Sequence, residues 1–126
     1  MPTPFIEKGH IYGVCSYGQL RCLRVDNGER VWEDLTATRD GKETRWGNAF
    51  LVKHKPSDRF FLFNELGDLI IAHLSPQGYK QIDKANLIEP TGKAMNRKVV
   101  WSHPAFANRN VLVRNDKELA SFSLAE

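Results

Sequence analysis

The two cysteines, Cys15 and Cys22, carry the most reactive side chains of the sequence, since thiolates bind zinc and exchange disulfides. Their spacing matches neither a zinc motif nor the Cys-x-x-Cys of thioredoxin-like proteins. If Tyr17-Gly18 is the turn of a hairpin, residues whose numbers sum to 35 face each other, and the two cysteines lie on a diagonal of about 7–8 Å. An unstrained disulfide needs a shorter separation. The sequence therefore predicts two reduced, buried thiols that serve as small hydrophobic groups.

The histidines and acidic residues form no recognised catalytic motif. The chain has no nucleophile elbow, no phosphate-binding loop and no zinc-protease motif. His73 falls in an apolar strand and is expected in the core, whereas His103 precedes a proline and is expected to be extended. The charged stretch 39–45 is expected to be a solvated loop. We therefore predict no catalytic residue, no cofactor and no metal site, and do not expect an enzyme.

Short β-rich segments, separated by polar or glycine-containing turns, dominate the chain and must position these side chains. The pattern predicts strands near residues 3–6, 10–16, 19–25, 29–33, 47–53, 59–64, 68–75, 79–83, 104–107, 110–114 and 118–124. No segment carries a sustained apolar stripe of helical period. The best alternative helix, 80–88, is short and runs into Pro90. The predicted fold class is all-β, built of antiparallel strands.

The strands repeat with a period of about 50 residues. Leu20, Leu69 and Leu119 each stand at the head of the second strand of a hairpin. Four strands per unit at this period are typical of a β-propeller blade, whereas a seven-stranded sandwich gives no reason for a fixed period. The predicted blade units are approximately residues 3–45, 46–100 and 101–126.

The distribution of apolar residues over the strand faces supports stacked sheets. Phe60 to Phe63 is apolar at every position, so both faces of the second sheet are expected to be covered. In the first hairpin, the assumed turn places Leu20 and Cys22 on one face and Tyr12 and Val14 on the other.

The stretch from Leu23 to Trp32 is more specific than the repeat pattern. It resembles the signature of PQQ-like (quinoprotein-like) β-propeller repeats, which reads roughly Leu-Asp-x-x-Thr-Gly-x-x-x-Trp. Leu23, Gly28 and Trp32 match this signature, whereas Arg24 replaces the usual Asp and Asn27 the usual Thr.

Other segments resemble the same family less closely. The segment from Trp101 to Phe106 is similar to an inter-blade junction of the family. In the second unit Gly78 matches Gly28, but Ile82 stands where the signature has Trp. The resemblance implies a tryptophan-docking propeller, usually of eight blades, of which this chain would supply about 2.75.

The tryptophans of such a signature have a physical role that does not depend on the family. A glycine such as Gly28 can adopt a positive φ in a turn, and a following Trp offers a large flat surface with an N–H that needs a partner. An aromatic platform for a ligand is the alternative role of the tryptophans. The residues predicted to act structurally between blades are Trp32, Trp46, Trp101, Gly28 and Pro104.

The composition is that of a globular protein and excludes several classes of function. Hydrophobic residues make up 41% and charged residues 26% of the chain. The net charge of +3 is mixed along the sequence, so no nucleic-acid-binding patch is predicted. The longest apolar run has only a few residues, against about 20 for a membrane span. The family resemblance suggests a periplasmic or other extracytoplasmic parent protein, while the sequence itself predicts no compartment.

The third unit ends after three strands, and Thr3-Pro4 enters directly into a junction that lacks its Trp. We therefore expect a C-terminal segment of a longer propeller. Repeat units bury their faces only against neighbours, so exposed faces are expected to bind other blades, a second copy or a protein partner. The predicted function is a non-catalytic scaffold or protein-interaction module. The alternatives are a fragment of a quinoprotein-type oxidoreductase whose cofactor site lies upstream, and a small ligand-binding β-domain that uses exposed tryptophans.

Overall fold

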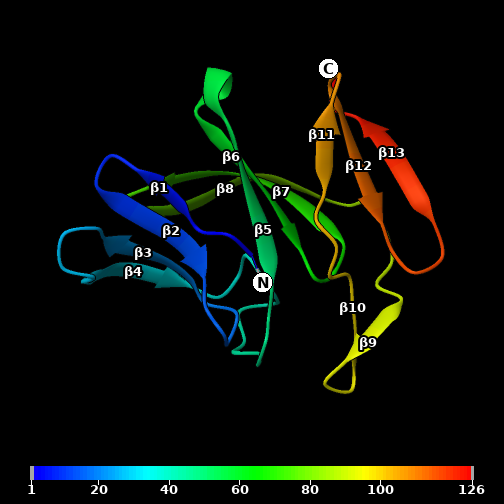
Figure 1. Cartoon of the computed structure of the whole chain (residues 1–126), viewed down its shortest axis with the longest axis horizontal. Helices are drawn as coiled ribbons and strands as arrows, with labels where there is room; N and C mark the ends of the chain where they lie inside the picture. Colours follow the sequence, from blue (N-terminus) through cyan, green and yellow to red (C-terminus); the bar gives the residue numbers. More distant parts are fainter. Residues whose placement is uncertain (1, 126) are drawn as a thin grey trace.

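The computed structural model describes residues 2–125, in which antiparallel strands form four sheets (Figure 1). Within each sheet, strands that follow each other in the sequence pair side by side. The first sheet contains β1 (Phe5–Glu7), β2 (His10–Val14), β3 (Leu20–Arg24) and β4 (Arg30–Asp34). The second contains β5 (Ala49–His54), β6 (Arg59–Asn64), β7 (Asp68–Ser75) and β8 (Gly78–Asn86), with a short 3₁₀ turn, Lys55–Ser57, between β5 and β6. A small hairpin of β9 (Gly92–Ala94) and β10 (Arg97–Val99) precedes the third sheet, β11 (Ala105–Ala107), β12 (Asn110–Arg114) and β13 (Leu119–Ser123). The all-β fold class is confirmed.

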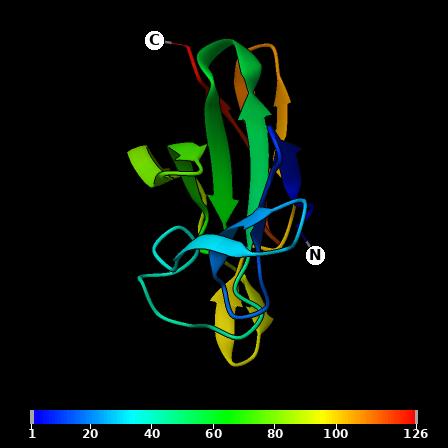
Figure 2. The same cartoon turned by 90° about the vertical axis from the view of Figure 1, so that its left-hand side faces the viewer.

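The strands predicted from the sequence all occur, with ends that differ by a few residues. The alternative helix over 80–88 is wrong, because β8 pairs with β7 along its whole length, from Ser75↔Gly78 to Asp68↔Asn86. The β9–β10 hairpin was not predicted; it projects from one end of the molecule (Figures 1 and 2). Its strands are three residues long and rich in basic side chains, so they lack an alternating apolar signal.

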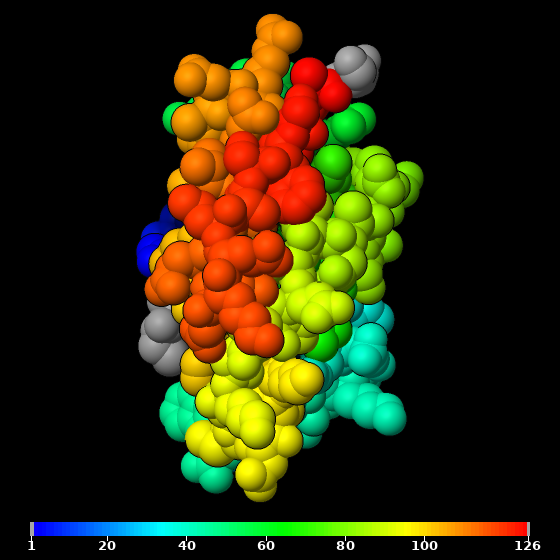
Figure 3. Space-filling view, turned by 90° about the vertical axis from the view of Figure 1, so that its right-hand side faces the viewer, coloured from blue at the N-terminus to red at the C-terminus, as the bar shows by residue number. Residues whose placement is uncertain are grey.

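The second sheet lies between the first and the third, and its central strands β6 and β7 are largely buried, as their apolar residues predicted. Alternate residues of β6 point to opposite sides, so that Phe60 and Leu62 face the first sheet and Phe63 faces the third. Figure 3 views the molecule from the side of the third sheet. In this view β8 lies beside the third sheet, and the β9–β10 hairpin lies at its end. The core between the first and second sheets consists of Tyr12, Leu20, Cys22, Ala37, Phe60, Leu62, Ile70, Ala72 and Leu74. The core on the other side consists of Phe50, Phe63, Leu69, Ile88, Val100, Val111 and Val113.

The register of the first hairpin differs by one residue from the predicted one. Val14 pairs with Leu20 and Tyr12 with Cys22, so facing residues sum to 34. The loop has one more residue than assumed, because the N–H of Gly18 donates to the carbonyl of Cys15 and Gly18 adopts a φ of 81°. Tyr12 and Cys22 therefore share a face, and the predicted assignment of faces was wrong. Both thiols are free, and Cys22 is buried as predicted. Cys15 is only half-buried, so the prediction of burial is wrong for this residue.

The prediction that His73 lies in the core is also wrong, since its side chain is exposed. His73 shares a face of β7 with Leu69 and Ile71, which border the third sheet. Leu69 and Ile71 line a hollow together with residues of β12 and β13, whereas His73, further along the strand, does not line it. His103, expected to be extended, precedes β11 and places its ring 3.9 Å from that of Phe50.

A buried ammonium group connects the first and second sheets. The Lys53 side chain, on β5, is only 5% exposed, and its Nζ lies 3.2 Å from Glu7 Oε2 of β1 and 2.6 Å from Asp58 Oδ1. The same ammonium lies 4.5 Å from the centre of the Phe60 ring. The hydrogen bond from Lys53 lowers the pKa of Asp58. The two carboxylates together compensate the buried charge of Lys53.

The lowered pKa of Asp58 predicts a pH-dependent stability. A carboxyl whose pKa is depressed by folding stabilises the fold above its unfolded pKa, about 3.9 for Asp, and loses that effect as the pH falls through its folded pKa. The Tm difference between the wild type and Asp58→Asn should therefore shrink as the pH is lowered from about 6 towards the folded pKa. Thermal unfolding followed by circular dichroism at each pH measures this difference. A difference that stays constant over the range would contradict the prediction.

The β6–β7 turn is fixed by polar contacts and by a glycine without space for a side chain. Asn64 Oδ1 accepts hydrogen bonds from the N–H groups of Leu66 and Asp68, and Asn64 Nδ2 donates to the carbonyl of Ala37. Gly67 has a φ of 84°, and a Cβ there would lie 1.9 Å from the carbonyl oxygen of Ile88. The turn therefore packs directly against the backbone that follows β8.

Two glycines with similar φ allow the cost of this close packing to be measured. Gly28 has a φ of 72°, and a Cβ there would meet no atom within 4 Å, so Gly28→Ala should cost only the left-handed strain, about 1–2 kcal/mol. Gly67→Ala adds the clash with Ile88 and should cost about 3 kcal/mol or more. Urea unfolding of both variants tests this order. Equal losses would show that the backbone at Ile88 moves away at little cost.

Candidate functional site

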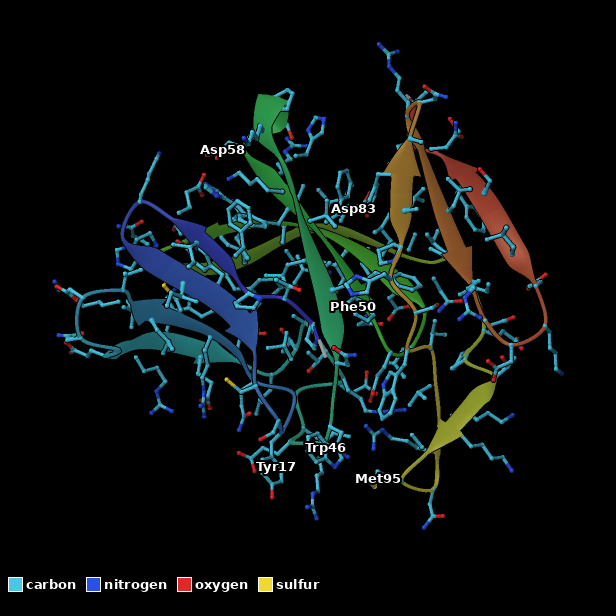
Figure 4. The ribbon with its side chains drawn as sticks, viewed as in Figure 1. Tyr17, Trp46, Phe50, Asp58, Asp83 and Met95 are labelled. Carbon is cyan, nitrogen blue, oxygen red and sulfur yellow. The ribbon has the colours of Figure 1, made fainter. Side chains whose placement is uncertain are left out.

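Large hydrophobic side chains gather at the end of the molecule that carries the β9–β10 hairpin. Tyr17, Trp46 and Met95 lie there together (Figure 4) and are 45%, 37% and 59% exposed. A cavity of about 250 Å³ opens at this end, between the β2–β3 turn, the segment before β5 and the β9–β10 hairpin. It is lined by Pro2, Val14, Cys15, Ser16, Trp46, Gly47, Asn48, Met95 and Trp101. The lining is mostly apolar, which is typical of sites for small molecules.

Trp46 is held in an unusual backbone conformation. Its φ is 61°, in the left-handed region that a bulky residue adopts only at a cost of about 1–3 kcal/mol. Its N–H donates to the carbonyl of Ser16, which ties the segment before β5 to the β2–β3 turn. The guanidinium of Arg45 lies 5.8 Å from the centre of the indole ring. These contacts fix the ring at the border of the cavity.

Trp101 is held by a buried carboxylate. Its indole Nε1 donates to Glu65 Oε2 at 3.0 Å, and the side chain of Glu65 is completely buried. Arg97 donates through Nε to Oε1 and through Nη2 to Oε2 of the same carboxylate, both at 3.0 Å, and Arg39 Nη1 lies 3.4 Å from Oε1. Two arginines and an indole therefore satisfy Glu65, as a buried charge requires. The carboxylate serves to fix Trp101 and the β9–β10 hairpin.

Asn48 lines the cavity and is only 9% exposed. Its backbone carbonyl accepts a hydrogen bond from the N–H of Glu65. Among the buried side-chain nitrogen and oxygen atoms of residues 2–125, Asn48 Oδ1 alone has no hydrogen-bond partner. This oxygen has almost no accessible surface, so the cavity does not expose it to a ligand.

The residues predicted from the sequence as inter-blade contacts fall into two groups. The indole Nε1 of Trp32 on β4 donates to the carbonyl of Ser75 on β7 at 2.7 Å, so this side chain joins the first and second sheets. Gly28 forms the β3–β4 turn, and Pro104 is half-buried just before β11. Trp46 and Trp101 instead border the cavity. The inter-blade role itself stays a prediction.

Sequence patterns do not distinguish Asn48, Glu65 or Arg97 from other polar residues. Glu65 lies in a turn between two strands, where a charged residue is expected to face solvent. Arg97 lies on a strand too short to recognise, and Asn48 is one polar residue in a stretch whose pattern indicates an inter-blade junction. No spacing within the sequence connects these three residues.

A second hollow, of about 690 Å³, lies between β5 and β6 on one side and β11 and β12 on the other. Phe61 and Phe106 line it and stack on each other, with ring centres 5.0 Å apart. The remaining lining includes Lys53, whose ammonium is already paired. The smaller cavity is the better candidate site, because two tryptophan side chains, Trp46 and Trp101, border it.

No protein-family model matches the chain, and no curated protein matches its sequence. The resemblance to PQQ-like repeats thus stays a prediction. Within residues 2–125, no three His, Cys, Asp or Glu side chains come together in a way that could hold a metal ion. In the same range no helix has the length and apolar character needed to cross a membrane.

The Glu65 cluster yields a prediction about stability. Glu65→Gln leaves two partly buried guanidinium groups without their buried carboxylate and should lower the free energy of unfolding by about 3–5 kcal/mol. Glu33→Gln, which breaks the more exposed pairs with Arg21 and Arg30, should change it little. Urea unfolding measures both. Similar small losses for the two variants would show that the buried cluster contributes no more than a surface ion pair.

Proposed function

We propose that this chain is a non-catalytic β-propeller segment that acts as a scaffold or protein-interaction module. The observation that carries this proposal is the stacking of three antiparallel sheets, in which the middle sheet is covered on both faces. In a propeller each blade contacts its two neighbours in this way. The first and third sheets each have one neighbour, and each presents its other face outward.

The outer face of the first sheet supports a docking role. Tyr12 and Cys22 point to the second sheet, so Ile11 and Leu23, which pair with each other, point outward. Ile6 pairs with Ile11 and extends the row across β1, β2 and β3, with Ile6 63% exposed. We define the outer row as Ile6, Ile11 and Leu23. A continuous apolar row across three strands is suited to pack against another sheet.

The partner we propose for this row is the third sheet of a second copy. In the chain, the sheets stack in the order first, second, third (Figure 1). Placing the third sheet of one copy on the first sheet of the next continues that order. On the outward side of β12 lies Leu112, since Val111 and Val113 face the second sheet. Contacts of this heterologous kind close into rings or continue as open assemblies.

The oligomeric state tests this proposal. Light scattering coupled to size exclusion, over a series of concentrations, should show association of the wild type. Ile6→Thr and Leu23→Thr should each weaken that association about tenfold or more, because they remove apolar area from the outer row. Ile82→Thr is the matched control, since Ile82 is exposed on β8, away from the row, and should leave association unchanged. A monomer at every concentration would contradict the proposal.

A ligand-binding β-domain is the second candidate function, and a separate observation favours it. Trp46 and Trp101 are partly exposed and border one cavity, whereas Trp32 is bound between two sheets.

A further inference from the structure

We propose that the free edge of β13 receives one extended peptide segment of a protein partner, which adds a fourth strand to the third sheet and places a basic side chain near Asp83. This inference rests on the interaction role proposed above and names a surface and a partner for it. The first and second sheets each have four strands, whereas the third has three. Within residues 2–125, no strand pairs with the edge of β13 that faces away from β12.

The ladder between β12 and β13 shows which backbone groups are available at this edge. The N–H of Leu124 donates to the carbonyl of Arg109. Hydrogen-bonded and non-bonded pairs alternate along an antiparallel ladder, so Phe122 also bonds to β12 and its two neighbours do not. An extended backbone can bond to the N–H and C=O groups that remain. The residues of β13 whose backbone groups point away from β12 are Leu119, Ser121 and Ser123.

The edge of β13 lacks the charges that commonly protect such an edge. Exposed edge strands pair readily with other chains, and proteins often prevent this with charged side chains. The fourth strands β4 and β8 form the corresponding edges of the other two sheets, and each carries three charged residues. No residue of β13 is charged, and Leu119 at its start is 70% exposed. The edge is therefore open to strand addition.

The fourth strand of a sheet also helps to complete the core beneath it. Trp32 on β4 and Tyr79 on β8 both pack against the core between the first and second sheets. The third sheet has no such strand, and a hollow of about 220 Å³ lies between β8 and β13. Leu69, Leu87 and Phe122 supply apolar surface to this hollow. An apolar side chain on an added strand would cover that surface.

Asp83 determines the charge that the partner should carry. It pairs with Ile71 across β7 and β8, and both residues line the hollow. Its Oδ1 accepts a hydrogen bond from the backbone N–H of Lys84, whose ammonium lies 3.5 Å from Asp68 instead. The exposed carboxylate of Asp83 is thus available to a cation from outside the chain. A lysine or arginine that faces the hollow from the added strand would supply that cation.

The surroundings of the edge favour a single strand over a second copy of the chain. Antiparallel pairing of two β13 strands relates two copies by a two-fold axis perpendicular to the sheet, so that the same face of both sheets lies on the same side. The second sheets of both copies would then share the space in which β8 lies beside the third sheet (Figure 3). A second β13 also has no basic residue to offer Asp83. A peptide with apolar and basic residues towards the hollow and polar residues towards solvent meets both conditions.

The probe is the blocked peptide Ac-Thr-Val-Thr-Lys-Thr-Val-Thr-NH₂, added to the full chain and followed by ¹H–¹⁵N NMR. Opposite residues of an antiparallel pair share a face, so the threonines should bond to β13 while the valines and the lysine face the hollow. Hydrogen exchange should slow at the edge amides, those of Leu119, Ser121 and Ser123, and change less at Phe122, which already bonds to β12. Absence of saturable binding, or unchanged exchange at the edge amides, would overturn the proposal.

Two N-methylated forms of the peptide test whether backbone hydrogen bonds are responsible for binding. Methyl groups on the threonine nitrogens replace the N–H groups that face β13 and should abolish binding. Methyl groups on the valine and lysine nitrogens point away from β13 and should leave the affinity nearly unchanged. Equal affinities of the two forms would show that the peptide does not bind as an added strand.

The charge of the partner is tested at Asp83. The peptide with lysine should bind about fivefold more tightly than the same peptide with glutamate in its place. Asp83→Asn should remove this preference, and Asp83→Lys should reverse it. Asp40→Lys makes the same change of charge at an exposed residue outside the hollow and should leave the preference as it is. A preference for lysine that persists in Asp83→Lys would overturn the role of Asp83.

Ser121→Pro tests the edge from the side of the chain. Because the N–H of Ser121 does not bond to β12, the fold should be retained, which circular dichroism measures, and peptide binding should be lost. Ser121→Thr keeps the N–H and is the matched control. If Ser121→Pro does not fold, the N-methylated peptides still test the same hydrogen bonds. Self-association that is lost in Ser121→Pro but kept in Ile6→Thr would show that a second copy occupies the edge and would overturn the proposed partner.

Peptide binding and association through the outer row can be tested separately. Ile6→Thr and Leu23→Thr leave the edge of β13 intact, so both variants should bind the peptide as the wild type does. A chain that binds the peptide but stays monomeric at every concentration would support the added strand and contradict the association of copies. A chain that associates but does not bind the peptide would do the reverse.

Discussion

The buried carboxylate of Glu65 is the interaction on which one end of the molecule depends. It receives hydrogen bonds from Arg97 on β10, from Arg39 in the connection between the first two sheets, and from the indole of Trp101. A buried charge must be compensated by nearby partners, so these three segments can leave the β6–β7 turn only at a high free-energy cost. The small β9–β10 hairpin has little apolar surface of its own, and this ion pair holds it against the rest of the fold. The cavity exists because the hairpin and Trp101 are held there.

The strands and the two-sided packing of the second sheet could be predicted from the sequence, because both follow from local patterns. Phe60 to Phe63 is apolar at every position, and a sheet covered on both faces buries Phe60, Leu62 and Phe63 and partly buries Phe61. The register of the first hairpin could not be predicted as reliably, because it depends on whether Gly18 adds one residue to the loop. A shift of one residue moved Tyr12 to the face that carries Cys22.

The repeat pattern also could not predict how exposed each equivalent residue is. Leu20, Leu69 and Leu119 occupy matching places in three hairpins, yet Leu20 is 0%, Leu69 5% and Leu119 70% exposed. The difference depends on whether another element covers the position, and that is a property of the assembled sheets. For the same reason the sequence analysis did not predict the residues of the candidate site. Asn48, Glu65 and Arg97 are far apart in the sequence, and the fold alone makes them neighbours.

The hydrogen bond from Trp32 to Ser75 joins two sheets through a side chain on one strand and a backbone carbonyl on the other. Every residue type carries that carbonyl, so the contact places a requirement on position 32 and none on the side chain at position 75. Related sequences could vary freely at position 75 while they retain the tryptophan. A search for co-varying pairs of positions would therefore find no signal between these two strands at this contact. Sheets joined in this way can keep their packing while their sequences diverge. The evolutionary relationship between such proteins is therefore harder to recognise from sequence than from structure.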